Sequence, residues 1–528
     1  MAEISLEFTP RPQQEEIFSF VKDAIANRKK FMMVDAPTGV GKSYAAIMIA
    51  EWYRKTHSKA KIDIVTNTKL LQDQYTKDFN FIATLKGKNN YHCSKHDTNC
   101  GVGAALNTLT KNSCKSCQYM IAKSNYARSP LSLTNFHLLT SYSMYAQEFL
   151  ADRGSQLLII DESHSFEEIY CGFISSVFSE RSLKQLDIWK DYMEVDLDKL
   201  SSLDEISEYI KNVIVPVLAN KISELNKTAL TIRTKAKRLD FIKKSELLDE
   251  IMCKYNRFVE DKDNYSTNWI FEKDLDTYGK VRILVEPIWG NIYLNEQFWK
   301  KYDHIILMSG TILNKELFSF IMGIPEEESE YLSLPCPFEA KNRPVIYLKF
   351  GKMSYYHKRQ TFEKAAPILT KILNKNIKHK GIIHTSTYEF SKWIGELVKN
   401  KRLLIHDFKN REQMLTKHLV STNETVLVSP SMFNGIDLKD ELSRFQIILK
   451  VPFPNLTSTK IKKRLASKPE WYNWKALTDL LQAYGRSIRN ENDWAETYIL
   501  DSCFDQILEN KNMPKYFLDA LKIKQPSN

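Results

Sequence analysis

A glycine-rich segment near the N-terminus, Ala36–Ser43, separates an apolar run from a helix-forming run. The apolar run, Phe31–Asp35, predicts a buried strand, and the run Tyr44–Ala50 predicts a helix. The segment itself, Ala-Pro-Thr-Gly-Val-Gly-Lys-Ser, fits the phosphate-loop pattern GxxxxGK[ST], except that Ala36 stands at the first glycine. Because such a loop joins a strand to a helix, the chain is predicted to build an α/β sheet around it.

The residues of this loop predict a site for ATP. Gly39 and Gly41 allow the backbone to curl, so that successive N–H groups face a polyphosphate at a helix N-terminus. Lys42 is expected to reach the β- and γ-phosphates, and the Ser43 hydroxyl is expected to ligate Mg²⁺. Thr38 lies in the same loop and is also expected to contact the nucleotide. The alternative is a glycine-rich turn that arose by chance.

A second apolar run, Leu157–Ile160, places two adjacent carboxylates at the end of a predicted strand. Asp161 suits a magnesium ion held through water, and Glu162 suits the orientation and deprotonation of the attacking water. A strand that ends in Asp-Glu is more often a solvated sheet edge. Beside a phosphate loop, however, the pair predicts the hydrolytic half of the ATP site.

A third segment, Leu481–Arg489, lies far along the chain and carries two arginines on one predicted helix face. Arg486 and Arg489 are three residues apart, and Gln482 lies one turn earlier. A second α/β domain without a phosphate loop could supply these arginines to the ATP of the first domain. A surface arginine pair on a C-terminal helix is the alternative.

Apolar and amphipathic stretches alternate, which predicts two α/β domains with parallel sheets, the first interrupted by two inserts. The first insert is rich in Lys, Asn, Ser, Cys and Gly. The second contains no glycine from Phe173 to Tyr278 and shows helical periodicity, with Pro216 as an expected kink. The predicted boundaries are 1–85, 124–172 and 281–330 for the first domain, 86–123 and 173–280 for its inserts, and 331–528 for the second domain. The predicted strands are Phe31–Asp35, Ile62–Thr66, Leu157–Asp161, Val281–Val285, His304–Met308, Gly381–Thr385, Thr425–Ser429, Phe445–Val451 and Thr497–Asp501.

The composition excludes several classes of protein. Hydrophobic residues make up 43% of the 528 and charged residues 26%, which excludes a disordered or collagen-like chain. No apolar run approaches the ~18 residues of a membrane span, and Met1–Glu7 begins no secretory signal. We therefore expect a cytoplasmic protein, of a bacterial or a phage-infected cell, with no membrane partner; a monomer is compatible with the sequence, which leaves the oligomeric state open. The net charge of +11 suits an anionic polymer but is modest for this length.

Four of the eight cysteines fall within 25 residues, in the spacing C-x6-C-x13-C-x2-C. In an intracellular protein such a cluster indicates a metal site rather than disulfides. Four thiolates suit either tetrahedral Zn²⁺ or a [4Fe–4S] cluster, and four unligated cysteines in a polar insert are the third possibility. The proposed ligands are Cys93, Cys100, Cys114 and Cys117.

Taken in order, these motifs resemble those of superfamily 2 helicases of the DinG/XPD type. Two positions depart from the family pattern: Gly310 replaces the alanine of its S-A-T motif, and Asn434 replaces the glutamate of its E-G-x-D motif. The matching segments are Arg11–Gln14, Ala36–Ser43, Val65–Gln72, Leu85–Cys93, Thr134–His137, Asp161–His164, Met308–Thr311, Gly435–Asp437, Gln482–Arg489 and Tyr498–Asp501.

The resemblance implies two RecA-like domains, an arch-like helical insert and an iron–sulfur cluster rather than zinc. It adds Arg11, Gln14, Gln482 and Asp437 to the nucleotide-binding residues. It also implies ATP-driven movement on single-stranded DNA with 5′-to-3′ polarity, and unwinding of forked or tailed duplexes.

Hydroxyl and amide side chains at the ends of predicted strands are candidate contacts to the phosphate backbone of DNA. Each is weak alone, since such residues often only cap helices. The candidates are Thr66, Asn67, Asn135, Thr385, Ser386 and Ser429.

Other functions use some of the same residues. A DNA-dependent translocase that remodels protein–DNA complexes would need the whole ATP site, so only a duplex substrate separates it from a helicase. A scaffold that binds DNA structures would not need Lys42, Glu162 and Arg486. A small-molecule kinase would need neither a second arginine-bearing domain nor a metal insert.

Overall fold

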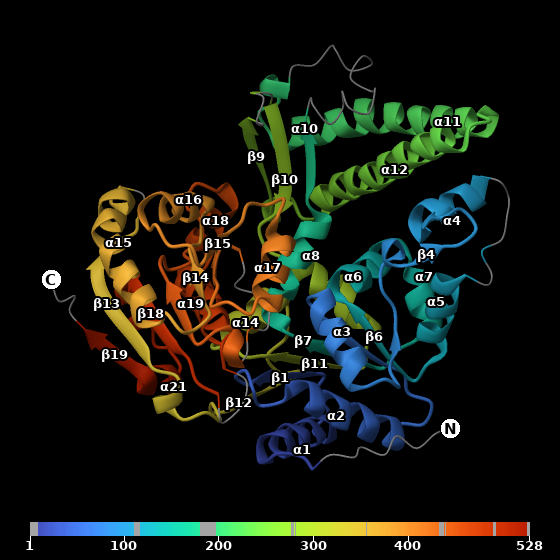
Figure 1. Ribbon diagram of the computed structural model, residues 1–528. Coiled ribbons are helices and arrows are strands. Elements are labelled where there is room, and N and C mark those ends of the chain that lie inside the picture. Colours follow the sequence, from blue (N-terminus) through green and yellow to red (C-terminus); the bar gives the residue numbers. More distant parts are fainter. Residues whose placement is uncertain are drawn as a thin grey trace.

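The computed structural model describes residues 9–109, 114, 117–179, 197–275, 279, 281–354, 356–431, 438, 440–488 and 493–524. Two α/β domains lie side by side, and a long helical pair projects above them (Figure 1). Each domain contains a seven-stranded sheet in which the pairings are parallel, as predicted from the alternating pattern. Among the described helices, none is long and apolar enough to cross a membrane.

The sheet of the first domain has the strand order β12-β1-β11-β7-β2-β6-β3. Its strands are β1 (Phe31–Asp35), β2 (Ile62–Thr66), β3 (Ala83–Thr84), β6 (Leu131–Asn135), β7 (Leu157–Asp161), β11 (His304–Ser309) and β12 (Ser329–Ser333). The sequence predictions for β1, β2, β7 and β11 are confirmed. These strands were recognisable because parallel strands covered on both faces are continuous apolar runs.

Helices cover both faces of this sheet, which creates two cores. Along β1, Phe31 and Met33 pack into one core and Met32 and Val34 into the other, because successive side chains of a strand point to opposite faces. The helices are α1 (Pro12–Ala26), α2 (Lys42–Thr56), α3 (Lys69–Asp78), α6 (Phe136–Tyr145), α7 (Gln147–Arg153), α8 (Phe166–Ile174), α13 (Asn291–Tyr293) and α14 (Lys315–Met322), with short turns η2 (Ser163–Ser165), η7 (Leu294–Phe298) and η8 (Trp299–Lys301).

The cysteine-bearing segment between β3 and β6 is more structured than its polar composition predicted. It contains η1 (Lys88–Asn90), β4 (His92–Cys93), β5 (Thr98–Asn99), α4 (Cys100–Leu109) and α5 (Gln118–Arg128). Leu106 of α4 packs with Ala229 and Ile242 of the helical pair. This small apolar cluster joins two segments that are far apart in the sequence.

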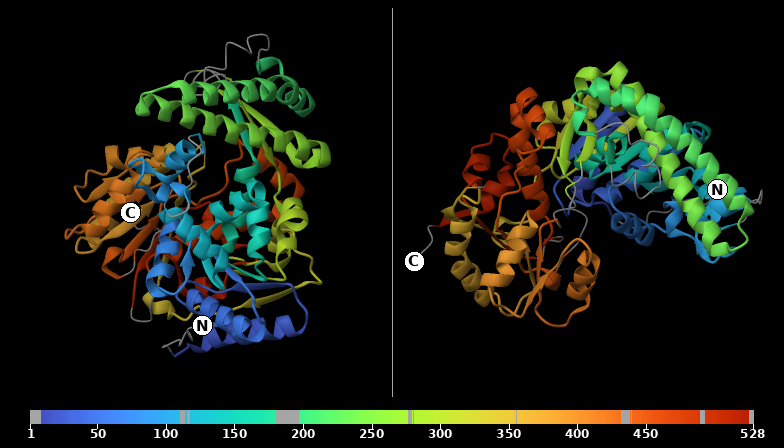
Figure 2. Two further views of the ribbon diagram at one scale, coloured as in Figure 1. Left: turned by 90° about the vertical axis from the view of Figure 1, so that its right-hand side faces the viewer. Right: turned by 90° about the horizontal axis from the view of Figure 1, so that it is seen from above.

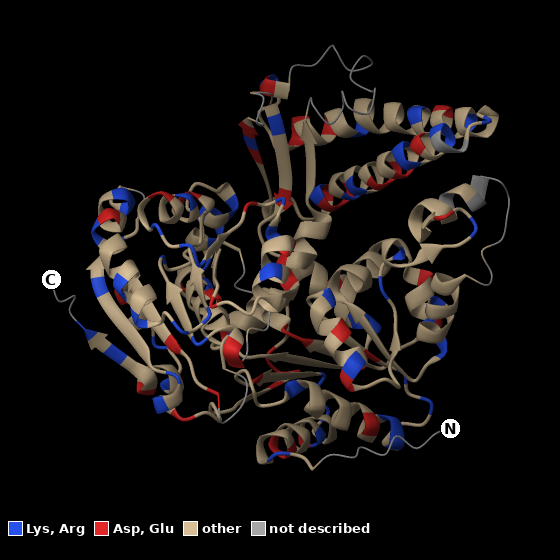
Figure 3. Cartoon of the chain, in the orientation of Figure 1, with Lys and Arg blue, Asp and Glu red and all other residues tan. Residues whose placement is uncertain are grey.

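The long helices α11 (Val215–Thr231) and α12 (Lys235–Asn264) form the helical pair, which extends over α4 (Figures 1 and 2). Both helices carry basic and acidic side chains along their length (Figure 3). Pro216 lies at the start of α11, directly after a π-helical turn, η5 (Ile210–Ile214), so the expected kink is a junction between helices. The shorter elements here are η4 (Leu197–Lys199), α10 (Leu203–Tyr209) and η6 (Ser266–Asn268).

The base of the helical pair is a separate antiparallel sheet, β8 (Ser176–Ser179), β10 (Val281–Pro287) and β9 (Trp269–Leu275), in that order. The predicted strand Val281–Val285 is therefore present as part of β10, but it does not join the parallel sheet. Burial of alternate residues along β10 explains the difference, since only one face of this small sheet is covered.

The sheet of the second domain has the strand order β15-β16-β14-β17-β18-β13-β19. Its strands are β13 (Val345–Gly351), β14 (Gly381–His384), β15 (Leu403–Ile405), β16 (Val426–Ser429), β17 (Phe445–Ile448), β18 (Glu496–Asp501) and β19 (Leu521–Lys524). Its helices are α15 (Lys358–Lys375), α16 (Tyr388–Leu397), α17 (Arg411–Val420), α18 (Thr459–Ser467), α19 (Pro469–Tyr484), α20 (Phe504–Leu508) and α21 (Lys515–Ala520), with turns η9 (Ala340–Asn342) and η10 (Asp440–Leu442). The predictions for β14, β16, β17 and β18 are confirmed, whereas β13, β15 and β19 were missed.

Helix α19 connects the two domains. Trp474 Nε1 donates to the carbonyl of Ile312 at 2.8 Å, directly after the end of β11. On the adjoining helix α18, the buried Arg464 guanidinium pairs with Glu167 of α8 at 2.6 Å. The C-terminal end of α19 is thereby placed over the edge of the first sheet at which β1 and β7 end.

Candidate active site

The phosphate loop lies between β1 and α2, and two glycines determine its shape. Gly39 and Gly41 have φ angles of +91° and +86°, which residues with side chains rarely adopt. A Cβ atom at Gly39 would lie 2.0 Å from the ring of Phe338, and one at Gly41 would lie 2.1 Å from Gln14 Nε2. The loop is therefore packed closely on two sides, and only glycine fits at either position.

Arg11 and Gln14 hold this loop from the start of α1. Arg11 Nη1 donates to the Gly39 carbonyl at 2.9 Å, and Gln14 Nε2 donates to the Gly41 carbonyl at 3.3 Å. Gln14 Oε1 accepts from the Arg11 backbone N–H at 2.9 Å, so both ends of the amide have partners within the protein. These two residues thus contact the backbone that would receive the phosphates.

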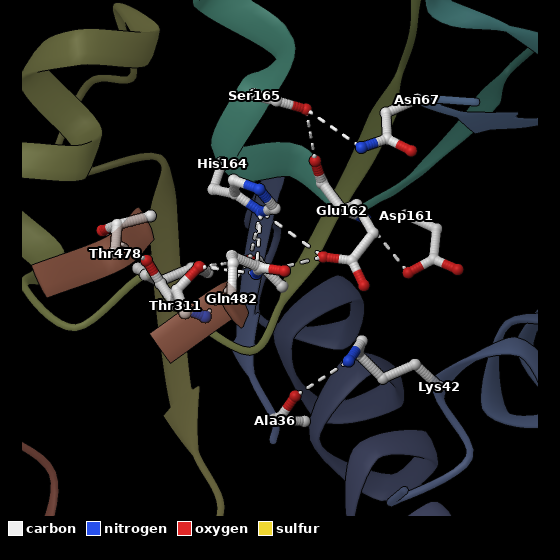
Figure 4. A network of polar contacts seen from close by, with 12 residues as sticks. Ala36, Lys42, Asn67, Asp161, Glu162, His164, Ser165, Thr311, Thr478 and Gln482 are labelled. Carbon is white, nitrogen blue, oxygen red and sulfur yellow. Dashed lines mark hydrogen bonds and ion pairs between the residues drawn. The ribbon is translucent and has the colours of Figure 1, made fainter. Parts of the chain in front are cut away.

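Lys42 and Ser43 begin helix α2. Lys42 Nζ donates to the Ala36 carbonyl at 3.0 Å, at the other end of the loop (Figure 4). The helix N-terminus has no capping side chain, because Gly41 precedes it, and its first amides can bind an anion. The loop thus combines a helix N-terminus that no side chain caps with a cation, which is the chemistry of a phosphate site.

Asp161 lies at the C-terminal end of β7, buried and hydrogen-bonded at both oxygens. Its Oδ2 accepts from the Tyr75 hydroxyl and its Oδ1 from the Glu162 N–H, each at 3.0 Å. Burial, and then the neighbouring charge of Glu162, raises the pKa of Asp161 to about 6, while Lys42 opposes this increase. A carboxylate in this environment gains stability from a nearby cation, so its chemistry fits Mg²⁺.

Glu162 points from the first domain toward the second (Figure 4). Its Oε2 lies 3.4 Å from Gln482 Nε2 and 3.4 Å from His164 Nδ1. Burial lowers the pKa of His164 to about 4, which leaves the imidazole neutral near pH 7. His164 Nδ1 also lies 2.9 Å from the Ser309 hydroxyl at the end of β11.

Gln482 and Arg486 reach this site from the end of α19. Gln482 Nε2 donates to Thr311 Oγ1 at 3.0 Å, and Arg486 Nη2 donates to Gln482 Oε1 at 2.7 Å. A Cβ atom at Gly485 would lie 2.8 Å from Thr38 Oγ1, so the helix end approaches the phosphate loop itself. The two domains are in contact at the carboxylate that would activate water.

The surroundings of Gly310 explain why a glycine replaces the alanine of the family pattern. A Cβ atom at Gly310 would lie 3.2 Å from the Ala36 carbonyl oxygen and 3.4 Å from Pro37 Cα. An alanine there would require the phosphate loop to shift by a few tenths of an ångström. The glycine allows the end of β11 to lie directly against the loop.

A cavity of about 660 Å³ opens between the domains at this point, a volume that suits a nucleotide. The wall formed by the first domain includes the predicted residues of the loop and both carboxylates. The second domain contributes Arg486 and the apolar side chains Leu415 and Leu419. The predicted residues that line it are Arg11, Gln14, Thr38, Gly39, Gly41, Lys42, Ser43, Asn67, Asp161, Glu162 and Arg486. The predicted residues Asp437 and Arg489 lie outside the described residues.

Three of the predicted DNA contacts have fully buried side chains. Thr66 and Thr385 each donate to the backbone carbonyl two residues later, at 3.2 and 3.1 Å, and the Ser429 hydroxyl lies 2.8 Å from His406 Nε2. These hydroxyls fix the turns that follow β2, β14 and β16. Contact of these three side chains with DNA stays a prediction.

The other three predicted DNA contacts also have partners within the protein. Asn67 Nδ2 lies 3.5 Å from the Ser165 hydroxyl, and Asn135 Oδ1 caps helix α6 by accepting from the Leu138 N–H at 3.0 Å. Ser386 adopts a φ of +59° and donates to the Lys450 carbonyl at 2.9 Å. Contact of these residues with DNA stays a prediction.

Three of the four cysteines that were proposed as metal ligands, Cys93, Cys100 and Cys117, are neighbours in the structure. Burial, together with the neighbouring Cys117 and Cys93 thiols, raises the pKa of Cys100 to about 11. The backbone of α4 lies against Cys93, since a Cβ atom at Gly103 would lie 2.4 Å from Cys93 Sγ. Within the described part of the chain, however, no three His, Cys, Asp or Glu side chains are arranged to hold a metal ion. Cysteine thiolates are chemically suited to bind a metal ion or an iron–sulfur cluster. In the positions that the structure describes, however, these cysteines do not form a complete set of ligands.

Sequence reasoning missed two residues of the site, Tyr75 and Phe338, and gave Thr311 no role although it belongs to the motif Met308–Thr311. Tyr75 bonds to Asp161, Thr311 bonds to Gln482, and Phe338 covers Gly39. Tyr75 could have been found from the pair Gln72 and Tyr75, which places two polar groups on the buried face of α3. Phe338 gave no local signal, because it lies in the connector between the two sheets.

Comparisons with known proteins cover most of the chain. Residues 371–523 match the family model of a helicase C-terminal domain, and residues 7–191 match that of the type III restriction enzyme res subunit. A probable ATP-dependent helicase of Methanocaldococcus jannaschii is 21% identical over 94% of this chain and 92% of its own length. The ATP-dependent DNA helicase DinG of Photobacterium profundum is 26% identical over 53% of this chain and 43% of its own length. A solved XPD helicase structure has a TM-score of 0.63 and 16% identity, and the match covers 98% of this chain and all of that one, which shows a shared fold.

Proposed function

We propose that this chain, a DinG/XPD-like superfamily 2 helicase, hydrolyses ATP between its two domains to move along single-stranded DNA and separate duplexes. The helicase-type matches in both domains and the helicase names of its relatives support an ATP-hydrolysing enzyme. The movement, its 5′-to-3′ polarity and the tailed or forked duplex substrate are the finer parts of this proposal. They rest on the motif resemblance described above.

The contact of Glu162 with Gln482 is the observation that carries the proposal. A carboxylate placed to activate water for hydrolysis lies 3.4 Å from an amide of the other domain. Hydrolysis at such a site depends on how closely the domains approach each other, and the products of hydrolysis change that approach. A kinase for small molecules would have no need for this coupling.

The residues of the cleft divide the chemistry among them. Lys42 and the amides at the start of α2 bind the β- and γ-phosphates, and Glu162 orients the attacking water and accepts its proton. Arg486 enters the cavity from the second domain, where it would stabilise the charge that develops on the phosphates. Mg²⁺, when bound near Ser43 and Asp161, would neutralise charge on the phosphate oxygens.

The cysteine-bearing segment would hold an iron–sulfur cluster, with Cys93, Cys100, Cys114 and Cys117 as ligands. Three of the thiols lie near one another, and α4 packs on the helical pair through Leu106. A cluster here would fix the segment against the helical pair, where the duplex would be separated. Zinc is the alternative that the same thiolates allow.

Strand displacement on two matched duplexes tests the proposed function. One duplex carries a 5′ single-stranded tail and the other a 3′ tail, and the protein is purified without air. We expect ATP-dependent displacement of the 5′-tailed duplex alone, and none with the Lys42→Ala variant.

Two outcomes would contradict parts of the proposal. Displacement of the 3′-tailed duplex alone would reverse the polarity. DNA-stimulated ATP hydrolysis without displacement of either duplex would instead favour a translocase that remodels protein–DNA complexes.

A further inference from the structure

Tyr75 is a buried tyrosine that lies against Asp161, one of the two residues of the proposed magnesium site. It belongs to α3, which follows β2, and its side chain is only 1% exposed. Its ring packs in the core that also contains Ile47 and Phe79. Nothing in the phosphate-loop or Asp-Glu motifs includes this residue.

The Tyr75 hydroxyl fixes Asp161 through a buried hydrogen bond. It donates to Asp161 Oδ2 at 3.0 Å, and both side chains are almost fully buried. Tyr75 belongs to α3 and Asp161 to the end of β7, so a residue of one element orients the carboxylate of another.

Such a hydrogen bond suits a metal site. A carboxylate that holds metal-bound water needs an oxygen fixed by a partner, and Asp161 has one partner on each oxygen, the Tyr75 hydroxyl and the Glu162 N–H. Each carboxylate oxygen keeps a further lone pair for the ion or its water.

We propose that Tyr75 is a positioning residue for the Mg²⁺ that accompanies the nucleotide: its hydroxyl fixes Asp161, so that the carboxylate presents its remaining lone pairs to the ion or its water. This inference rests on the proposed function, because it assumes that Ser43 and Asp161 serve a magnesium–nucleotide complex. It adds a third residue, from a third element, to that site.

The Tyr75→Phe variant tests the proposal, because it removes the hydroxyl and keeps the ring. Binding of a fluorescent ADP analogue is measured at increasing Mg²⁺ concentration and also without Mg²⁺. We expect the Mg²⁺ concentration for half-maximal binding to rise about tenfold, the lower range for losing a partner of a metal ligand. Binding without Mg²⁺ is expected to be unchanged, since the phosphate loop is intact.

Tyr126→Phe is the matched control. Tyr126 is also buried and donates to an aspartate, Asp63, at 2.8 Å, but Asp63, unlike Asp161, does not line the nucleotide cavity. The substitution removes a comparable buried hydrogen bond without touching the magnesium site. We expect no change in the Mg²⁺ dependence of this variant. The melting temperature of each variant, measured without nucleotide or Mg²⁺, establishes that it is folded before the titration.

The outcomes separate this inference from the proposed function. An unchanged Mg²⁺ dependence in the Tyr75 variant, or an equal shift in Tyr126→Phe, would overturn the role of Tyr75 alone. A wild-type protein that binds no nucleotide at any Mg²⁺ concentration would overturn the proposed function, and the inference with it.

Discussion

Glu162 shows how a single residue can be placed by an uncommon backbone conformation. Its φ is +58°, in the left-handed region that residues with side chains seldom occupy. This conformation follows the end of β7 and turns the chain into η2, while the side chain reaches Gln482 of the other domain. Strain of this kind persists only where the surrounding structure holds it, and it is concentrated at functional sites.

Glu162→Gln is therefore expected to keep nucleotide binding and lose hydrolysis. The amide retains the size of the carboxylate and one acceptor oxygen, but it cannot accept a proton from water. We expect the DNA-stimulated hydrolysis rate to fall by about 10²- to 10⁴-fold, with the affinity for the ADP analogue unchanged. Glu148→Gln, on the exposed surface of α7, is the control and should hydrolyse ATP at the wild-type rate. Substantial turnover by Glu162→Gln would show that another group activates the water.

At the scale of elements, the cysteine-bearing segment has too little apolar interior to be stable alone. Its strands β4 and β5 have two residues each, and α4 contacts the helical pair through one small cluster. A bound metal or cluster would supply the missing stability. The cysteines would then be structural ligands, and loss of one would alter this segment more than the distant ATP site.

Cys117→Ser tests this interpretation. We expect anaerobically purified wild-type protein to contain iron and sulfide, and the variant to lose most of both. Strand displacement should be lost, whereas DNA-stimulated ATP hydrolysis should persist in part, because Cys117 does not line the nucleotide cavity. Cys503→Ser, in the second domain, is the control. Unchanged metal content in Cys117→Ser would exclude this cysteine as a ligand, and zinc without iron would select the alternative metal.

Sequence patterns predicted the central strands of both sheets and missed the outer ones. β14, β16, β17 and β18 are buried runs whose apolar pattern is plain. β15 has three residues and β19 is largely exposed, so neither forms a buried apolar run. β13 combines a buried start with an exposed end and shifts register against β18, which obscures its pattern.

At the scale of the whole molecule, the sequence predicted the residues that carry the chemistry of the site better than the residues that hold them in position. Lys42, Asp161 and Glu162 belong to local motifs, whose residue types alone indicate phosphate and water chemistry. Phe338 and Tyr75 act through contacts between segments distant in sequence, and no local pattern reports such contacts. The arrangement of the two domains decided which residues complete the site.

The stability of the whole molecule is expected to fall as the pH decreases below about 6.5, because three histidines are buried in neutral form. Burial lowers the pKa of His164 to about 4, of His384 to about 3 and of His418 to about 4. Between these values and 6.5, the unfolded chain binds protons that the folded chain does not, so unfolding becomes more favourable as the pH falls. Several carboxyls act in the opposite direction, because a raised pKa lets the folded state bind a proton first; a net decrease in stability would therefore show that the histidines dominate. These carboxyls are Asp35, Asp161, Glu246, Asp261 and Asp479.

His418→Gln makes this argument testable away from the ATP site. His418 is buried in the second domain, where its ring nitrogens lie 2.9 Å from the Leu442 carbonyl and 2.9 Å from the Thr425 hydroxyl. Between pH 6.5 and pH 5, each such histidine is expected to lower the free energy of unfolding by about 2 kcal/mol. The melting temperature, measured by calorimetry without Mg²⁺ or nucleotide, should therefore decrease less between pH 7.5 and 5 in the variant than in the wild type. The exposed His92→Gln should show the wild-type decrease, and an equally steep decrease in His418→Gln would mean that protonation of His418 does not limit acid stability.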